Sequence, residues 1–106
     1  MSNSKLFVHG FRNNLSLADR TTMIINLFSE YGTVKMIPNP KSDDPDELQP
    51  AIVFIKDKEK GDGSYKNFCF VEMEDEAGAL AVLENCANVD FEGGIRLSTS
   101  LAKEKN

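Results

Sequence analysis

The sequence contains no tryptophan, one histidine and two cysteines among its 106 residues. Two thiols are too few for a disulfide framework. Because both Cys69 and Cys86 lie in apolar patterns, we expect them to be buried free thiols. A metal site needs several closely spaced ligands, and a single histidine does not supply them. We therefore expect neither a metal ion nor a cofactor.

Long apolar runs are also missing. No stretch approaches the roughly 20 apolar residues that cross a bilayer. The first residues, Met-Ser-Asn-Ser-Lys, lack the apolar segment of a signal peptide. We therefore expect an intracellular protein, in the nucleus or the cytoplasm, with no membrane partner. The length predicts a single domain over residues 1–106.

Basic residues are outnumbered, and the net charge of −5 argues against strong nonspecific binding to nucleic acid. The charge is unevenly distributed, because no basic residue occurs between Lys66 and Arg96. The acids of that segment are Glu72, Glu74, Asp75, Glu76, Glu84, Asp90 and Glu92, and Asp43, Asp44, Asp46 and Glu47 form a second group. The other segments are net positive, which predicts a polarised surface.

Hydrophobic periodicity predicts alternating strands and helices. Strand patterns cover residues 5–9, 51–56, 65–73 and 95–101, and residues 33–37 also look extended. Apolar residues at helical spacing predict helices over 16–31 and 75–87. Four prolines bracket the acidic stretch at about 38–50, which we expect to be a mobile loop that neither helix nor sheet tolerates. Residues 103–106 are expected to form a flexible tail.

The octapeptide at residues 66–73 predicts a strand with two different faces. Successive side chains of a strand point to opposite sides, so Lys66, Phe68 and Phe70 share one face with Glu72. The smaller or more apolar alternate residues form the other face. A water-facing surface with phenylalanines beside a lysine suits stacking against bases next to a phosphate. The competing interpretation is that a helix or another protein covers these rings.

The order strand, helix, strand, strand, helix, strand resembles that of the RNA-recognition motif family. The residues that carry the resemblance are Leu6-Phe7-Val8-His9-Gly10-Phe11 on the first strand, the octapeptide, and the segments 27–34, 57–61 and 97–103. The resemblance implies an α+β, ferredoxin-like βαββαβ two-layer sandwich. Its four-stranded antiparallel sheet would carry both helices on one face and leave the other face open to single-stranded RNA.

The same resemblance implies a set of RNA-binding residues. Phe7 and Phe68 would stack on two successive bases, Phe70 would contact sugars or a third base, and Lys66 would meet a phosphate. Base edges could be read by Arg96, Ser98, Ser100 and the exit segment with Lys103. From the residues alone, His9 is either a polar residue of the sheet or a further base contact. The sequence departs from the family pattern at Asn67, where glycine is usual, and at Cys69, Met73 and His9.

Three functions compete at this stage. The first is noncatalytic binding of single-stranded RNA, with single-stranded DNA as an alternative ligand. The second is a protein-interaction module on the same scaffold, using the acidic loop or a helix face. Peptide-binding relatives carry an Arg-x-Phe loop before the last strand, whereas residues 89–93 here read Val-Asp-Phe-Glu-Gly. The third is a small enzyme such as an acyl phosphate hydrolase, but the segment 10–14 offers only Arg12 as a cationic group, so we predict no catalysis.

Overall fold

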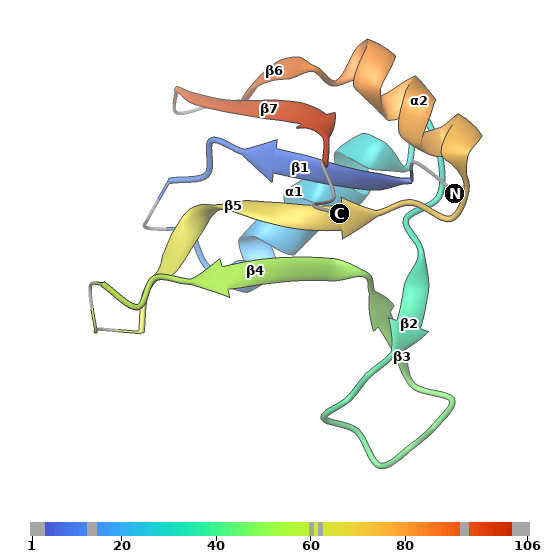
Figure 1. Cartoon of the computed structure of the whole chain (residues 1–106), viewed down its shortest axis with the longest axis vertical. Helices are drawn as coiled ribbons and strands as arrows, with labels where there is room; N and C mark the ends of the chain where they lie inside the picture. Colours follow the sequence, from blue (N-terminus) through green and yellow to red (C-terminus); the bar gives the residue numbers. More distant parts are fainter. Residues whose placement is uncertain (1–3, 13–14, 60, 62, 92–93, 103–106) are drawn as a thin grey trace.

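The computed structural model describes residues 4–12, 15–59, 61, 63–91 and 94–102. Its elements in chain order are β1 (Lys5–His9), α1 (Leu17–Phe28), β2 (Met36–Pro38), β3 (Leu48–Pro50), β4 (Ile52–Lys56), β5 (Tyr65–Glu72), α2 (Glu76–Asn85), β6 (Asn88–Phe91) and β7 (Ile95–Leu101). Figure 1 labels these elements in a view in which the strands of the main sheet run across the page.

The main sheet has the strand order β4-β5-β1-β7-β6, and all neighbouring strands are antiparallel. The ferredoxin-like fold class is thereby confirmed, but the expected number of four strands was too low. The fifth strand, β6, pairs with β7 because its residues alternate: Val89 and Phe91 pack toward the core, while Asn88 and Asp90 are exposed. This hairpin widens the sheet beside β7.

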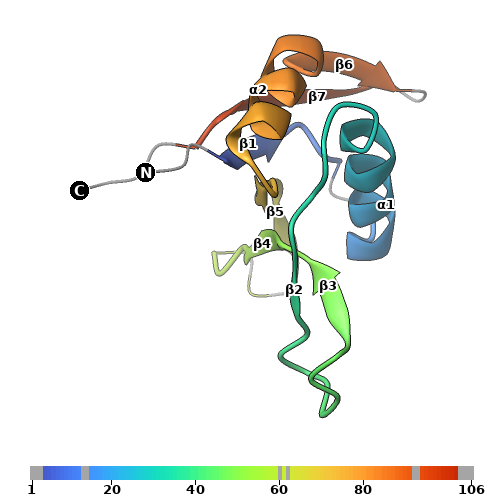
Figure 2. The same cartoon turned by 90° about the vertical axis from the view of Figure 1, so that its right-hand side faces the viewer.

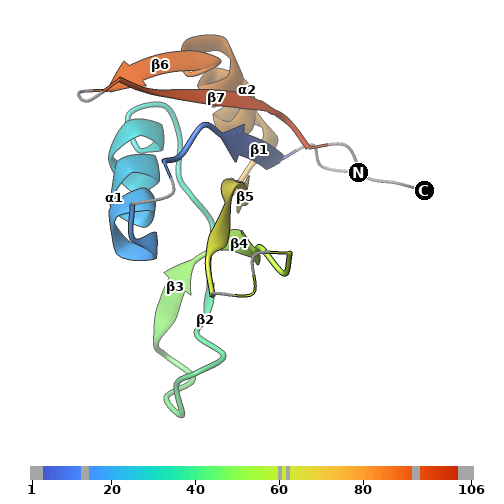
Figure 3. The ribbon, with the colours of Figure 1, turned by 90° about the vertical axis from the view of Figure 1, so that its left-hand side faces the viewer.

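The core lies between one face of the sheet and both helices. In β1, Leu6 and Val8 are fully buried and the alternate residues are not, as the period of a strand requires. The buried residues that join the two layers are Leu6, Val8, Cys69, Val71 and Leu97 from the sheet, Ile24 and Phe28 from α1, and Ala79 and Val82 from α2. The prediction that both helices cover one face is confirmed. In Figures 2 and 3, α1 stands to one side of β1 and β5.

Both helices begin at capping side chains. Ser16 caps α1 by accepting a 3.1 Å hydrogen bond from the backbone N–H of Asp19. Asp75 caps α2 by accepting a 2.7 Å bond from the N–H of Gly78. Such caps satisfy N–H groups that have no partner within the helix. The helices are shorter than the expected ranges of 16–31 and 75–87, because capping and turn residues flank each of them.

The acidic insertion is not the unpaired loop that its prolines predicted. Strands β2 and β3 form a two-stranded sheet of their own, in which Met36 lies opposite Pro50 and Pro38 opposite Leu48. Pro38 and Pro50 are tolerated because each is the last residue of its short strand, where a ladder hydrogen bond is least needed, and Pro40 and Pro45 lie in the tip between the strands. The tip of this hairpin, residues 39–47, projects beyond β4 and away from β1 and β7 (Figure 1).

Both cysteines are buried free thiols, as predicted. Burial raises the pKa of Cys69 to about 12, so its thiol is protonated at neutral pH. Burial also raises the pKa of Cys86. Within the described ranges, no group of His, Cys, Asp and Glu side chains could hold a metal ion. No helix in that part of the chain is long and apolar enough to span a membrane.

Candidate functional site

The sheet face opposite the helices brings together residues from all five strands, and we call it the open face. Register pairs place Phe7 directly beside Phe70 on one side and Ser100 on the other, and His9 beside Phe68 and Ser98. The pairs Val53 with Phe70 and Asp90 with Arg96 extend these rows to the outer strands. The open face is thus a continuous surface with aromatic residues at its centre and polar residues toward β6.

Four rings form a cluster at the centre of the open face. The centroid of Phe7 lies 5.2 Å from Phe68, 5.5 Å from Phe70 and 5.5 Å from His9. Phe68 and Phe70 are edge-to-face at 6.1 Å. These separations are typical of favourable aromatic pairs. The phenylalanines are partly exposed and His9 is exposed, so the cluster presents ring surface to solvent without a covering helix.

Lysines flank one end of the cluster. The Nζ of Lys5 lies 5.5 Å from the ring centroid of Phe70, within the range of a cation–π contact. Lys35 forms a 2.8 Å ion pair with Glu72, the residue opposite Lys5 in the ladder. Together with Val53, which is 51% exposed, these residues border a shallow hollow beside Phe70. This end of the open face offers positive charge next to an aromatic ring.

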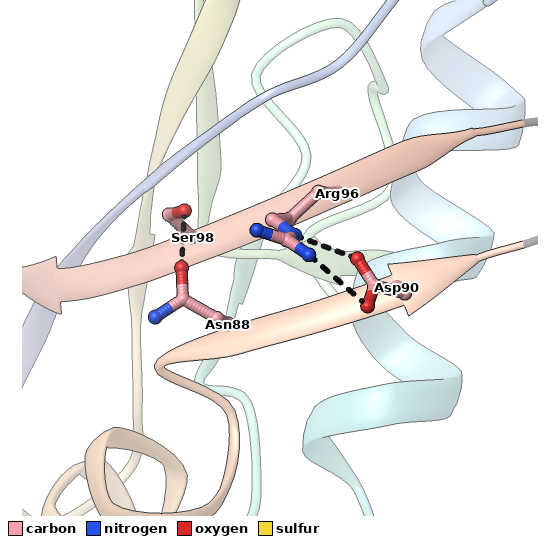
Figure 4. Close-up of polar contacts among 4 residues, drawn as sticks. All are labelled: Asn88, Asp90, Arg96 and Ser98. Atoms are coloured by element: carbon pink, nitrogen blue, oxygen red, sulfur yellow. Dashed lines mark hydrogen bonds and ion pairs between the residues drawn. The ribbon is translucent and has the colours of Figure 1, made fainter.

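The β6–β7 hairpin carries two polar pairs at the other side of the open face (Figure 4). The Nε of Arg96 donates to Oδ1 of Asp90 at 2.7 Å, and its Nη2 donates to Oδ2 at 3.4 Å. Ser98 donates a 2.9 Å hydrogen bond to Oδ1 of Asn88. The hydrogen bond from Arg96, with its positive charge, lowers the pKa of Asp90, and Asp90 raises the pKa of Arg96. Both groups are therefore ionised at neutral pH.

A buried arginine supports this face from below. Arg20 of α1 is only 2% exposed, and its guanidinium donates to the backbone carbonyls of Arg12, Leu15 and Lys66 at 3.1, 3.2 and 2.9 Å. Desolvation lowers its pKa. The contact to Lys66 joins the helix to the strand that carries Phe68. Arg20 therefore fixes the start of β5 relative to α1.

Most residues of the sequence-predicted site share the open face. They are Phe7, His9, Phe68, Phe70, Arg96, Ser98 and Ser100, and strand alternation puts Lys66 on the same side. Lys103 lies outside the described residues. The pairing of Arg96 with Asp90, and of Ser98 with Asn88, was not foreseen. The signal was the alternation of residues 88–91, which marks a strand able to place Asn88 and Asp90 beside β7.

The chain is similar in structure to several solved RNA-binding proteins. These include a complex of the Sxl-lethal protein with RNA (TM-score 0.62, 21% identity, 94% of this chain and 48% of that one). They also include RNA binding protein PG1 (TM-score 0.64, 24% identity, 97% and 98%). A third is the second RRM domain of the yeast poly(U)-binding protein Pub1 (TM-score 0.60, 16% identity, 96% and 96%).

The chain thus spans about half the length of the Sxl-lethal chain, at 48%. No family model matches the sequence, and no curated protein matches it. At identities of 16 to 24%, the likeness is one of fold.

Proposed function

We propose that this chain, which has the RNA-recognition-motif fold, binds single-stranded RNA on its open face without catalysing a reaction. The observation that carries the proposal is the cluster of Phe7, Phe68, Phe70 and His9 on the face that the helices leave uncovered. These rings are partly exposed and contribute little to the core, so their apolar surface in contact with water is unfavourable. Stacking against bases would remove them from water.

Each element of the open face has a role in this proposal. Phe7 and Phe68 stack on two successive bases, while Phe70 contacts a sugar or a third base. Lys66 neutralises a phosphate at the start of β5. Base edges are met by His9, Arg96, Ser98, Ser100 and Lys103. The RNA-bound Sxl-lethal protein and the RNA-binding neighbours support the ligand class, because they share the fold.

Removal of the two central rings tests the proposal. Each base–aromatic stack is worth about 1 to 3 kcal/mol, whereas a micromolar complex has only about 8 kcal/mol in total. We expect Phe7→Ala with Phe68→Ala to weaken binding of a random octaribonucleotide pool by about 100-fold or more. Fluorescence anisotropy measures the affinity, and circular dichroism checks that the double variant folds.

A matched control is Tyr31→Ala, which removes an exposed aromatic residue outside the open face. This variant should bind RNA as the native chain does. The proposal fails if the native chain binds no member of the pool at millimolar concentration, or if the double variant binds as well as the control. A parallel titration with the deoxyribonucleotide pool shows whether single-stranded DNA is also accepted.

The protein-interaction alternative predicts a different outcome. A partner that docks on the acidic hairpin or on α2 would be insensitive to Phe7 and Phe68. A partner on α2 would instead respond to Leu80, an exposed apolar residue of that helix, and a partner on the hairpin would respond to its acidic tip. Recovery of a protein partner whose binding is lost in Leu80→Ala but kept in the Phe7, Phe68 double variant would favour this alternative.

A further inference from the structure

The ion pair between Asp90 and Arg96 leaves part of the guanidinium available. Asp90 occupies the side formed by Nε and Nη2, at 2.7 and 3.4 Å. The donors of the other side, on Nη1 and the outer N–H of Nη2, have no hydrogen-bond partner among the described residues. In Figure 4 the third guanidinium nitrogen points away from Asp90, along the sheet toward Ser98. The side chains of Arg96 and Asp90 are 66% and 71% exposed, so a ligand can reach these donors.

Resting on the proposed function, we infer that Arg96, held by Asp90, selects guanine at one position of the bound RNA. Its outward pair of N–H groups would donate to O6 and N7 of a guanine that lies over His9. Two parallel donors match those two acceptors, and arginine with guanine is the commonest specific contact of this kind. In this arrangement Asp90 binds no base itself and acts as a positioning residue that holds the guanidinium of Arg96.

The strand register places Arg96 within reach of such a base. His9 lies directly opposite Ser98, and Arg96 is two residues further along the same face of β7. Diagonal neighbours across an antiparallel pair are about 7 to 8 Å apart, which long side chains span. Beyond His9 the chain continues with Gly10, where a Cβ would clash with the carbonyl oxygen of Arg96. The absence of a side chain at Gly10 therefore lets the end of β1 lie close to the backbone of β7 at Arg96.

The charge of Asp90 favours a base edge over a phosphate. Because the carboxylate neutralises Arg96, a phosphate brought to this pair would meet an anion 2.7 Å from the guanidinium nitrogen. The edge of guanine formed by O6 and N7 is neutral and carries only acceptors, so it gains both hydrogen bonds without this repulsion. Adenine presents an amino donor beside N7, and uracil has an N–H between its two carbonyl oxygens. Cytosine is the one other base with adjacent acceptors, O2 and N3, so equal affinity for guanosine and cytidine would overturn the assignment of guanine.

The hydrogen bond between Ser98 and Asn88 adds a further hydrogen-bond donor beside Arg96. Because Oδ1 of Asn88 accepts from Ser98, the side chain of Asn88 turns its amide nitrogen outward (Figure 4). Amide and guanidinium thus offer donors side by side along β6 and β7. Asn88 and Arg96 together therefore favour a ligand edge that is rich in hydrogen-bond acceptors.

Oligouridylates with one substituted position test this inference. We expect guanosine at the best position to bind about tenfold more tightly than adenosine, cytidine or uridine. Inosine retains O6 and N7 and should equal guanosine, whereas 7-deazaguanosine lacks N7 and should lose most of the advantage. Fluorescence anisotropy at fixed salt measures each affinity, with the substituted position moved along the oligonucleotide.

Protein variants separate base selection from charge. Arg96→Lys keeps the positive charge but loses the planar pair of donors, so the guanosine advantage should fall below about threefold while uridylate affinity is retained. Asp90→Ala releases Arg96, so it should lower the guanosine advantage, raise uridylate affinity and steepen the salt dependence by about 0.7 in log–log slope. Glu84→Ala on the exposed side of α2 removes the same charge away from the open face and should change none of these values.

The outcomes are distinct from those of the proposed function. If no oligonucleotide binds, RNA binding itself is wrong. If oligouridylates bind but guanosine gives no advantage at any position, the inference is wrong and RNA binding stands. An advantage that 7-deazaguanosine retains, or that survives in Arg96→Lys, would likewise overturn the assignment to Arg96. If the sole effect of Asp90→Ala is on affinity and salt slope, Arg96 is a phosphate contact.

Discussion

At the scale of single residues, Arg20 is the most unusual member of the core. Its side chain is 2% exposed, yet no carboxylate forms an ion pair with it in the part of the chain that the structure describes. Three backbone carbonyls and the ring of Phe11, 5.5 Å away, take the place of a counterion. A buried charge is tolerated when hydrogen bonds replace its hydration. Arg20 therefore acts as a crosslink between α1, the segment after β1 and the start of β5.

We expect Arg20→Met to lower the free energy of unfolding by about 3 kcal/mol. The methionine fills a similar volume, but it removes the Arg20 donor from the carbonyls of Leu15 and Lys66, while the carbonyl of Arg12 keeps the backbone N–H of Leu15. Urea denaturation followed by circular dichroism measures the change. The exposed Arg12 provides the control, since Arg12→Met should stay within about 0.5 kcal/mol of the native value. A loss below about 1 kcal/mol for Arg20→Met would show that the carbonyls of Leu15 and Lys66 find other donors.

Helical periodicity places Arg20 on the buried face of α1, but periodicity alone does not predict that its charged side chain is buried. Arg20 is four residues before Ile24 and eight before Phe28, so it continues the buried stripe of α1. A charged residue at the end of such a stripe is normally expected to reach water. Its burial depends on carbonyls of two other segments, including one 46 residues away, and no local pattern specifies those partners.

At the scale of elements, the β2–β3 hairpin is an appendage of the sheet. Its tip is mostly exposed, and its backbone closes on itself through a 2.9 Å hydrogen bond from Asn39 to Glu47. The root of the hairpin, with Pro50 and Gln49, lies near Leu17 and Thr21 of α1. Figure 1 shows the tip extending away from β1 and β7. The hairpin thus adds acidic residues without placing them on the aromatic cluster.

We expect replacement of residues 40–46 by Asn-Gly to preserve both fold and RNA affinity. Asn-Gly supplies the tight turn that a two-residue hairpin needs, and the rest of the ladder remains paired. The dissociation constant for RNA should change by less than about threefold at 0.15 M salt, where charges beyond roughly 8 Å are screened. Anisotropy and thermal unfolding measure the two quantities.

A variant with Asp43, Asp44 and Asp46 replaced by Asn keeps the length of the tip and serves as the control for charge. If the shortened hairpin loses RNA binding and the Asn variant does not, the shape of the tip contributes to the site. If both gain affinity strongly, the acids act on the open face at long range.

Short strands explain why the sequence predicted some elements better than others. The five-residue β1 and the eight-residue β5 have long enough alternation to define their buried faces. In contrast, β2 and β3 have three residues each and carry prolines, and β6 has four. Such segments become strands only because a partner lies beside them. The pairing of Asp90 with Arg96 follows from the β6–β7 register, so it could not be predicted from a sequence analysis that did not include β6.

At the scale of the whole molecule, the order of elements was sufficient to predict the two-layer fold. Each long strand alternates and each helix carries one apolar stripe, and a single sandwich buries all of these faces together. The aromatic positions of the candidate site were predicted for the same reason: Phe7 and Phe68 occupy the alternate positions that the core does not use. The acids of α2 and its flanks, Glu74, Asp75, Glu76 and Glu84, lie in the helical layer and are exposed.

This division of charge predicts a shallow salt dependence for RNA binding. On the described part of the open face, Lys5 and Lys66 have no ion-pair partner, whereas Lys35 and Arg96 are each paired with an acid. Two phosphate contacts to a single strand give a log–log slope of about −1.4, which is about a sevenfold loss of affinity between 50 and 200 mM salt. Most of the binding free energy should therefore come from stacking, which salt hardly affects.

Titrations at four salt concentrations measure this slope for three proteins. Lys66→Gln removes one phosphate contact and should flatten the slope by about 0.7. Phe68→Ala should weaken binding at every salt concentration while leaving the slope unchanged, because a stacked ring releases no counterion. A native slope steeper than about −3 would mean that phosphate attraction dominates, which a chain of net charge −5 could achieve only by gathering further cations around the RNA. In that case the aromatic cluster would be secondary to an electrostatic site elsewhere on the molecule.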